Sequence, residues 1–164
     1  MSRLTDVIDA LTRVGCAADG SSAAPFPLAC AVVPPDDPVD VVSSWVGYDL
    51  PGELSELWRA SGGARLFEDL EYGQWGLILL SADASASRSA LEASSRASDF
   101  GTDDIVIGEF LGDQELLVFS QREGVLVALP LDGRADWFVA GSSLAAFLED
   151  YLAAGGEKFW EQRS

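Results

Sequence analysis

Four short apolar segments follow one another in the second half of the chain, with only turn residues between them. They span residues 104–110, 115–119, 124–129 and 137–140. Gly112-Asp113, Arg122-Glu123-Gly124 and Asp132-Gly133 supply the turn signals. Connections this short join neighbouring antiparallel strands, because parallel strands need a crossover of about a dozen residues or more. The spacing therefore predicts an antiparallel meander.

Apolar residues recur at helical spacing in several other segments. The expected helices span residues 4–14, 39–46, 51–61, 83–100 and 144–152. The third opens with Leu50-Pro51, because proline suits the first helical turn, and Gly62-Gly63 is expected to end it in left-handed backbone. Its Leu54, Leu57 and Trp58 should be buried with Leu50. The fourth is expected to be a surface helix with a weakly apolar stripe of Ala86, Ala90, Leu91, Ala93 and Ala97.

Three more strands complete the predicted sheet. Residues 26–33 read as an edge strand, and residues 64–67 and 74–80 read as two further strands. The second of these, 74–80, is almost continuously apolar and is expected to lie in the sheet interior. Helices, then strands, then a helix predict an α+β fold, an antiparallel meander with helices packed on one face. The rigid break at residues 34–38 divides the chain into an N-terminal helix and arm, 1–38, and a domain, 39–164.

The charge balance and the missing histidine exclude several function classes. With 27 acidic and 10 basic residues, the chain carries a net charge of −17, which repels nucleic acids and anionic membranes and favours a basic partner. The alternative is that the acidity serves solubility alone. Without any histidine the chain can form neither a Ser-His-Asp triad nor a histidine zinc site.

Other signals for catalysis, cofactors or export are weak. Cys16 and Cys30 are expected to be reduced and buried. Acidic residues around 99–115 lack the spacing of a calcium loop, so no metal or cofactor is expected. Asp6 and Asp9 interrupt the first segment where a signal peptide needs an apolar run, and no stretch is long enough to span a membrane. We therefore expect a cytoplasmic protein.

The ordered set of segments resembles a known superfamily. It consists of the helix from Leu50-Pro51 to Gly62-Gly63, then Leu66-Phe67, Gln74-Trp75-Gly76, IVIGEFLGDQELLVF (105–119), SSLAAFLEDYL (142–152) and Phe159-Trp160. In this order, over about residues 39–160, the chain resembles the SMI1/KNR4 (SUKH) superfamily. The resemblance implies an α+β fold with an antiparallel sheet, and either a bacterial immunity protein that neutralises a cognate toxin or an adaptor-like regulatory protein. It implies no catalytic residue.

The resemblance and the charge together give our first hypothesis, an immunity protein that binds a basic, nuclease-type toxin domain. An intracellular adaptor that binds a host protein is the alternative, and we do not expect an enzyme. Acidic residues near aromatic ones would steer and anchor a basic surface. Trp75, which follows the first group below in the sequence, is either a residue of the hydrophobic core or an anchoring side chain for the partner. The expected partner-binding residues are Glu68, Asp69, Glu71 and Tyr72 in a first group, and Asp103, Asp104, Asp113 and Glu115 in a second.

Overall fold

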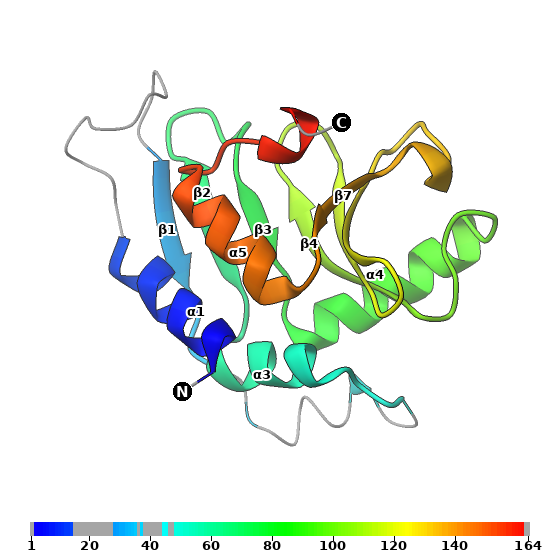
Figure 1. Ribbon diagram of the computed structural model, residues 1–164, viewed down its shortest axis with the longest axis horizontal. Coiled ribbons are helices and arrows are strands. Elements are labelled where there is room, and N and C mark those ends of the chain that lie inside the picture. The colour runs from blue at the N-terminus through cyan, green and yellow to red at the C-terminus, as the bar shows by residue number, and fades with distance from the viewer. Residues whose placement is uncertain (1, 15–27, 36, 38–43, 46–47, 163–164) are drawn as a thin grey trace.

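The computed structural model describes residues 2–14, 28–35, 37, 44–45 and 48–162, which are arranged around one seven-stranded antiparallel sheet (Figure 1). The strands are β1 (Leu28–Val32), β2 (Ala64–Asp69), β3 (Leu77–Leu79), β4 (Asp104–Phe110), β5 (Leu116–Ser120), β6 (Gly124–Ala128) and β7 (Phe138–Gly141). They lie in the sheet in chain order, so each strand pairs with its neighbours in sequence. The predicted meander is confirmed, and it extends through all seven strands.

α1 (Arg3–Val14) and α5 (Leu144–Ala153) lie side by side on one face of the sheet, and α3 (Gly52–Ala60) packs beside α1 (Figure 1). Their inward side chains are apolar and almost fully buried, as the complete burial of Leu54 and Phe147 illustrates. These side chains pack against inward-facing residues of the strands and form the main core. The expected α+β arrangement, with helices on one face, is confirmed for these three helices.

The opposite face of the sheet carries a second, smaller apolar cluster. Its strand residues are Val106, Leu116, Val118, Leu126 and Ala128. Phe100 and Trp137 pack on them, with ring centroids 5.0 Å apart. Phe100 follows α4 (Ala82–Ser95), and Trp137 follows the short 3-10 helix η1 (Arg134–Asp136). Both faces of β5 are therefore buried, which accounts for its uninterrupted apolar sequence.

α4 attaches to β4 where β3 provides no pairing. β3 pairs with β4 only from Gly108 onwards. Two residues earlier, the Ser85 hydroxyl donates to the Val106 carbonyl at 2.5 Å, and the Ser89 hydroxyl accepts from the Val106 N–H at 2.8 Å. The helix thus satisfies strand backbone groups with small hydroxyl side chains. The predicted apolar stripe is wrong, because Ala86 is only half-buried and the other members are exposed: Ala90, Leu91, Ala93 and Ala97.

The third predicted helix is confirmed as α3, but its end differs from the prediction. Ser61, in extended backbone at φ −153°, follows the last helical residue, and its N–H donates to the Leu57 carbonyl at 2.8 Å. Gly63 has φ +116°, and a Cβ there would lie 2.8 Å from the Leu79 carbonyl oxygen. Glycine is therefore required for close approach to β3, and it does not stop the helix.

The N-terminal segments share the core and the sheet of the remaining chain. α1 buries Leu4, Val7, Ile8 and Leu11, and β1 forms one edge of the sheet, as predicted for this segment.

Several predictions fall partly outside the described residues. Cys30 on β1 is a buried, free cysteine, whereas Cys16 lies outside the described residues. Most of the helix expected over 39–46 also lies outside them. Trp45, from that segment, is buried and stacks on Trp58 with ring centroids 5.8 Å apart.

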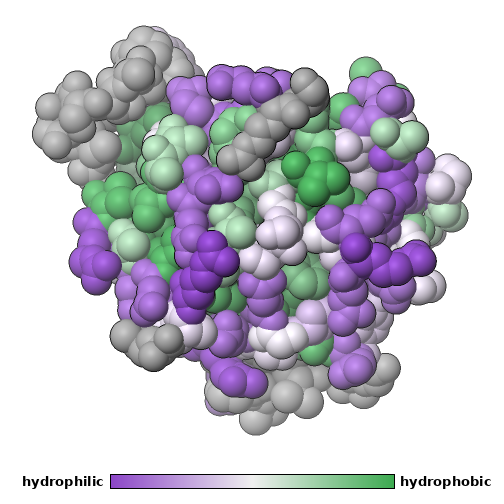
Figure 2. All heavy atoms as spheres, viewed as in Figure 1, coloured by the Kyte–Doolittle hydropathy of each residue, from purple (hydrophilic) through white to green (hydrophobic). Residues whose placement is uncertain are grey.

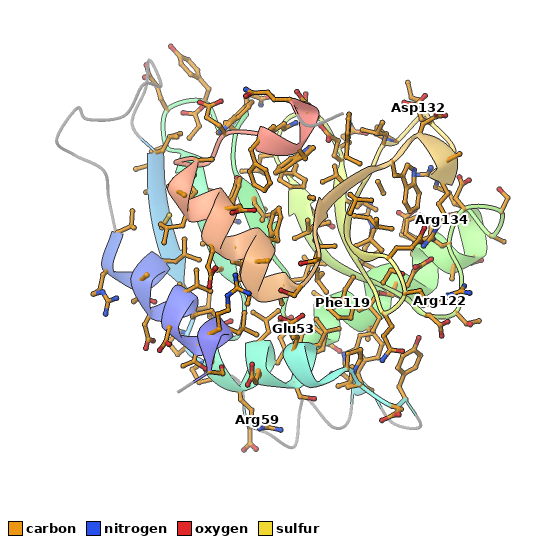
Figure 3. All side chains as sticks on the ribbon, in the orientation of Figure 1. Glu53, Arg59, Phe119, Arg122, Asp132 and Arg134 are labelled. Carbon is orange, nitrogen blue, oxygen red and sulfur yellow. The ribbon has the colours of Figure 1, made fainter. Side chains whose placement is uncertain are left out.

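Glu53 joins α3 to the N-terminus of α5 (Figure 3). One carboxylate oxygen accepts from the Leu144 N–H at 2.9 Å, and the other accepts from the Ala145 N–H at 3.0 Å. Ser143 caps the same helix by accepting from the Ala146 N–H at 3.1 Å. The first N–H groups of a helix have no acceptor inside the helix. Glu53, 91 residues away in the sequence, supplies the acceptors for two of these groups. Glu53 thus gives α3 a structural role at the start of α5.

Candidate partner-binding surface

Three segments that are far apart in the chain meet at one end of the sheet (Figure 1, top). They are the β2–β3 turn (70–76), the β4–β5 turn (111–115) and the segment after α5 (154–162), which includes the 3-10 helix η2 (Phe159–Gln162). Alternate turns of an antiparallel meander lie at the same end, so the topology brings the two turns together. The Leu111 N–H donates to the Gly76 carbonyl at 2.9 Å, and Trp75 Nε1 donates to the Gly156 carbonyl at 3.1 Å. We call these three segments, residues 70–76, 111–115 and 154–162, the apical surface.

Backbone geometry holds the apical surface closely packed. A Cβ at Gly112 would lie 2.3 Å from the Gln74 carbonyl oxygen, so the two turns are in direct contact. In the described chain the two non-glycine residues with positive φ lie here or directly beneath, Gln114 at 59° and Phe67 at 52°. Such conformations cost about 1–3 kcal/mol each and persist only where surrounding contacts hold them. The apical surface is therefore a preorganised feature of the fold.

The outer side of the apical surface combines acids with apolar and aromatic side chains. Glu71, Asp113 and Glu157 are exposed, and so are Leu70 at 53% and Tyr72 at 64%. Figure 2 shows hydrophilic side chains along the upper rim of the molecule, where these segments lie. A basic protein surface would find both charge and anchoring side chains here.

Lys158 lies beneath this outer layer and connects its segments. Its Nζ is 2.5 Å from Asp113 Oδ2 and 2.5 Å from Glu115 Oε1. The same atom lies 5.5 Å from the centroid of the Trp75 ring and 5.7 Å from that of Phe110. Burial alone lowers the pKa of this ammonium group, but the two carboxylates outweigh that effect and raise the pKa above its ordinary value.

The first predicted group is only partly available to a partner. Asp69 is 2% exposed, and its carboxylate accepts from the Glu71 and Tyr72 N–H groups at 2.9 and 3.1 Å, which shapes the turn. Glu68 lies on β2 and pairs with Arg65. The prediction that Asp69 is an exposed, partner-facing acid is wrong, because the carboxylate is used to satisfy turn backbone. Glu71 and Tyr72 remain exposed.

The second predicted group is divided between opposite ends of β4. Asp113 and Glu115 follow β4 and belong to the apical surface, although Glu115 is only 5% exposed. Asp103 directly precedes β4 and Asp104 is its first residue, and of these Asp103 alone is exposed. Exposure of Asp104 and Glu115 was wrongly predicted, because local sequence does not reveal the basic side chain that each one meets across the fold.

Asp104 meets Arg134, which lies in the connection between β6 and β7 (Figure 3). Arg134 also pairs with Glu123, and its guanidinium lies 5.4 Å from the Trp137 ring centroid. These acids hold the pKa of Arg134 above its ordinary value, mainly through the Asp104 hydrogen bonds. An open cleft of about 560 Å³ lies here, lined by Asp103, Arg122 and Arg134 among others. Most acidic side chains of this cleft are paired with arginines, so among the described residues this end of the sheet presents fewer unpaired carboxylates to a basic partner than the apical surface does.

Lys158 is the residue of this surface that sequence reasoning missed. It is the chain's single lysine, among nine arginines, and it lies two residues before Trp160. The C-terminal tail is docked on the fold, since Trp160 is 1% exposed and its ring centroid lies 5.2 Å from that of Phe110. A lone cation just before a tail-anchoring tryptophan was the available signal.

The described residues contain no cluster of three or more potential metal ligands from His, Cys, Asp and Glu. Within the same residues, no helix combines the length and apolar character required to cross a bilayer. No protein-family model matches the chain, and no curated protein matches it.

Proposed function

We propose that the protein is a cytoplasmic bacterial immunity protein whose apical surface binds and neutralises a basic, nuclease-type toxin domain. The observation that carries the proposal is the convergence of exposed Glu71, Asp113 and Glu157 with exposed Leu70 and Tyr72 on a rigid end of the sheet. The resemblance to the SMI1/KNR4 superfamily supports the same function. Binding through a presented surface needs no reactive side chain.

The net charge gives the apical surface a physical role in association. A net charge of −17 creates a long-range attraction for a basic domain, which raises the rate of encounter at low ionic strength. Exposed apolar and aromatic side chains then supply contact area that excludes water. Strain and tight turn packing keep these groups in place before binding, which reduces the entropy lost on association.

The test uses a triple variant, Glu71→Gln, Asp113→Asn and Glu157→Gln, and a matched control, Asp9→Asn, Asp49→Asn and Asp83→Asn. Both sets replace exposed acids and change the net charge by the same amount, but the control residues lie outside the apical surface. The partner to test is a basic, nuclease-type toxin domain, sought first among the products of neighbouring genes. Its association is measured by stopped flow, and its neutralisation by rescue of growth in cells that produce it. We expect the apical variant to associate about tenfold more slowly at low salt and to rescue poorly.

The control should associate within about twofold of the wild-type rate, because it keeps the local charge of the apical surface. Equal slowing in both variants would show that only total charge matters and would contradict the assignment of the surface. Tight binding without growth rescue would favour the adaptor function instead.

A further inference from the structure

The apical surface already holds one basic side chain, supplied by the protein's own tail. Lys158 Nζ has carboxylate oxygens of Asp113 and Glu115 at 2.5 Å, and its side chain is only 9% exposed. The rings of Trp75 and Phe110 lie within cation–π distance of the ammonium group. Two carboxylates and two aromatic rings are the chemistry that recognises a lysine or arginine side chain.

The side chains around Lys158 Nζ are Asp113, Glu115, Trp75 and Phe110, and we call this cluster the Asp113–Glu115 pocket. One ammonium group does not satisfy all of its hydrogen-bond acceptors. Glu115 is 5% exposed, and among the described residues its Oε2 atom has no hydrogen-bond partner. A buried acceptor without a partner is costly, so the pocket favours an additional or better donor. Two carboxylates also face a single positive charge. A guanidinium group, with five donors in a planar fork, could satisfy more of these oxygens than an ammonium group does.

The tail has an anchor that does not depend on Lys158. Trp160 is 1% exposed and packs against Phe110 and Phe147, with ring centroids 5.2 and 5.9 Å away. Trp75 Nε1 also holds the Gly156 carbonyl. The lysine side chain can therefore leave the pocket while these contacts keep the tail docked.

We propose that the Asp113–Glu115 pocket is a subsite for a lysine or arginine side chain of the basic partner, and that Lys158 occupies it as an intramolecular competitor in the free protein. The inference rests on the proposed function, because it specifies how the same surface takes its partner. Its consequence is that Lys158 weakens binding, whereas a purely structural lysine would support it.

The test measures the binding of a fluorescein-labelled decalysine peptide by fluorescence anisotropy at low salt. Lys158→Met keeps the apolar stem over the rings but removes the competing charge. Arg3→Met is the matched control, because it removes one positive charge from an exposed pair with Glu149 outside the apical surface. We expect Lys158→Met to bind the peptide about three- to tenfold more tightly than wild type, and Arg3→Met to stay within about twofold.

Glu115→Gln in the Lys158→Met background should reverse most of that gain. Unchanged or weaker binding by Lys158→Met would overturn the inference. Loss of folding in both Lys158→Met and Lys158→Gln, judged by thermal melting, would also overturn it, because a competitor must be removable. Failure of the proposed function would give a different result. The triple variant Glu71→Gln, Asp113→Asn and Glu157→Gln would then bind decalysine as tightly as the wild type does.

Discussion

Removing the Glu53 carboxylate should uncap α5 and destabilise the whole domain. Its two oxygens accept from the Leu144 and Ala145 N–H groups at 2.9 and 3.0 Å, at the positive end of the helix dipole. Each charge-assisted bond contributes more than a neutral one, and its loss leaves an N–H group without a partner in a half-buried position. We expect Glu53→Ala to cost about 2–3 kcal/mol, at or just above the upper end for loss of a single helix cap, because two charge-assisted bonds are removed. For a domain of this size the melting temperature should fall by about 5–10 °C.

Calorimetry and urea unfolding measure this effect, with Glu56→Ala as the control. Glu56 lies on the same helix and is half-buried, so its replacement changes charge and helix propensity in a similar way without removing the α5 cap. Glu53→Gln should be intermediate, because the amide keeps one acceptor and turns an NH2 group toward a backbone donor. The reasoning is refuted if Glu53→Ala unfolds within about 0.5 kcal/mol of Glu56→Ala, which is the scatter expected for uncoupled surface changes.

Two further predictions concern the core. Trp58 is 1% exposed and its Nε1 donates to the Leu80 carbonyl, so Trp58→Ala should lower the free energy of unfolding by about 3–5 kcal/mol in urea titrations; near-normal stability would contradict this burial. Burial also raises the pKa of the Tyr151 hydroxyl, so the unfolded chain loses this proton at lower pH than the native protein. The free energy of unfolding should therefore be maintained below about pH 10 and fall as the pH rises further. In urea titrations this fall should be smaller in Tyr151→Phe than in the wild type. An identical fall in both proteins would contradict a raised pKa of Tyr151.

Local sequence determined the strands, most helices and the order of the last four strands in the sheet. The tandem segments from Asp104 to Gly141 alternate with short turn signals, and such turns leave only antiparallel neighbours. Helical spacing likewise located α1, α3 and α5, because each has a stripe of apolar residues that must be buried. These features depend on residues a few positions apart, so the chain pattern contains them.

The errors arose where long-range contacts decide the outcome. α4 packs through Ser85 and Ser89 because β3 is too short to pair with Val106, and no local pattern in the helix encodes the length of a neighbouring strand. Ser61 ends α3, and residue 63 has to be glycine because its backbone lies close to β3. In each case a distant backbone sets the requirement.

The candidate surface divides in the same way between sequence and tertiary structure. The sequence determined that the chain is strongly acidic, lacks histidine and places acids beside aromatic residues in its turns. Tertiary structure alone decided which acids face outward, because the environment of a carboxylate depends on the cation or backbone group that folding brings to it. Asp104 meets Arg134 and Glu115 meets Lys158 across 30 and 43 residues of chain, whereas Glu71 stays exposed. Burial and pairing over such separations are properties of the assembled fold.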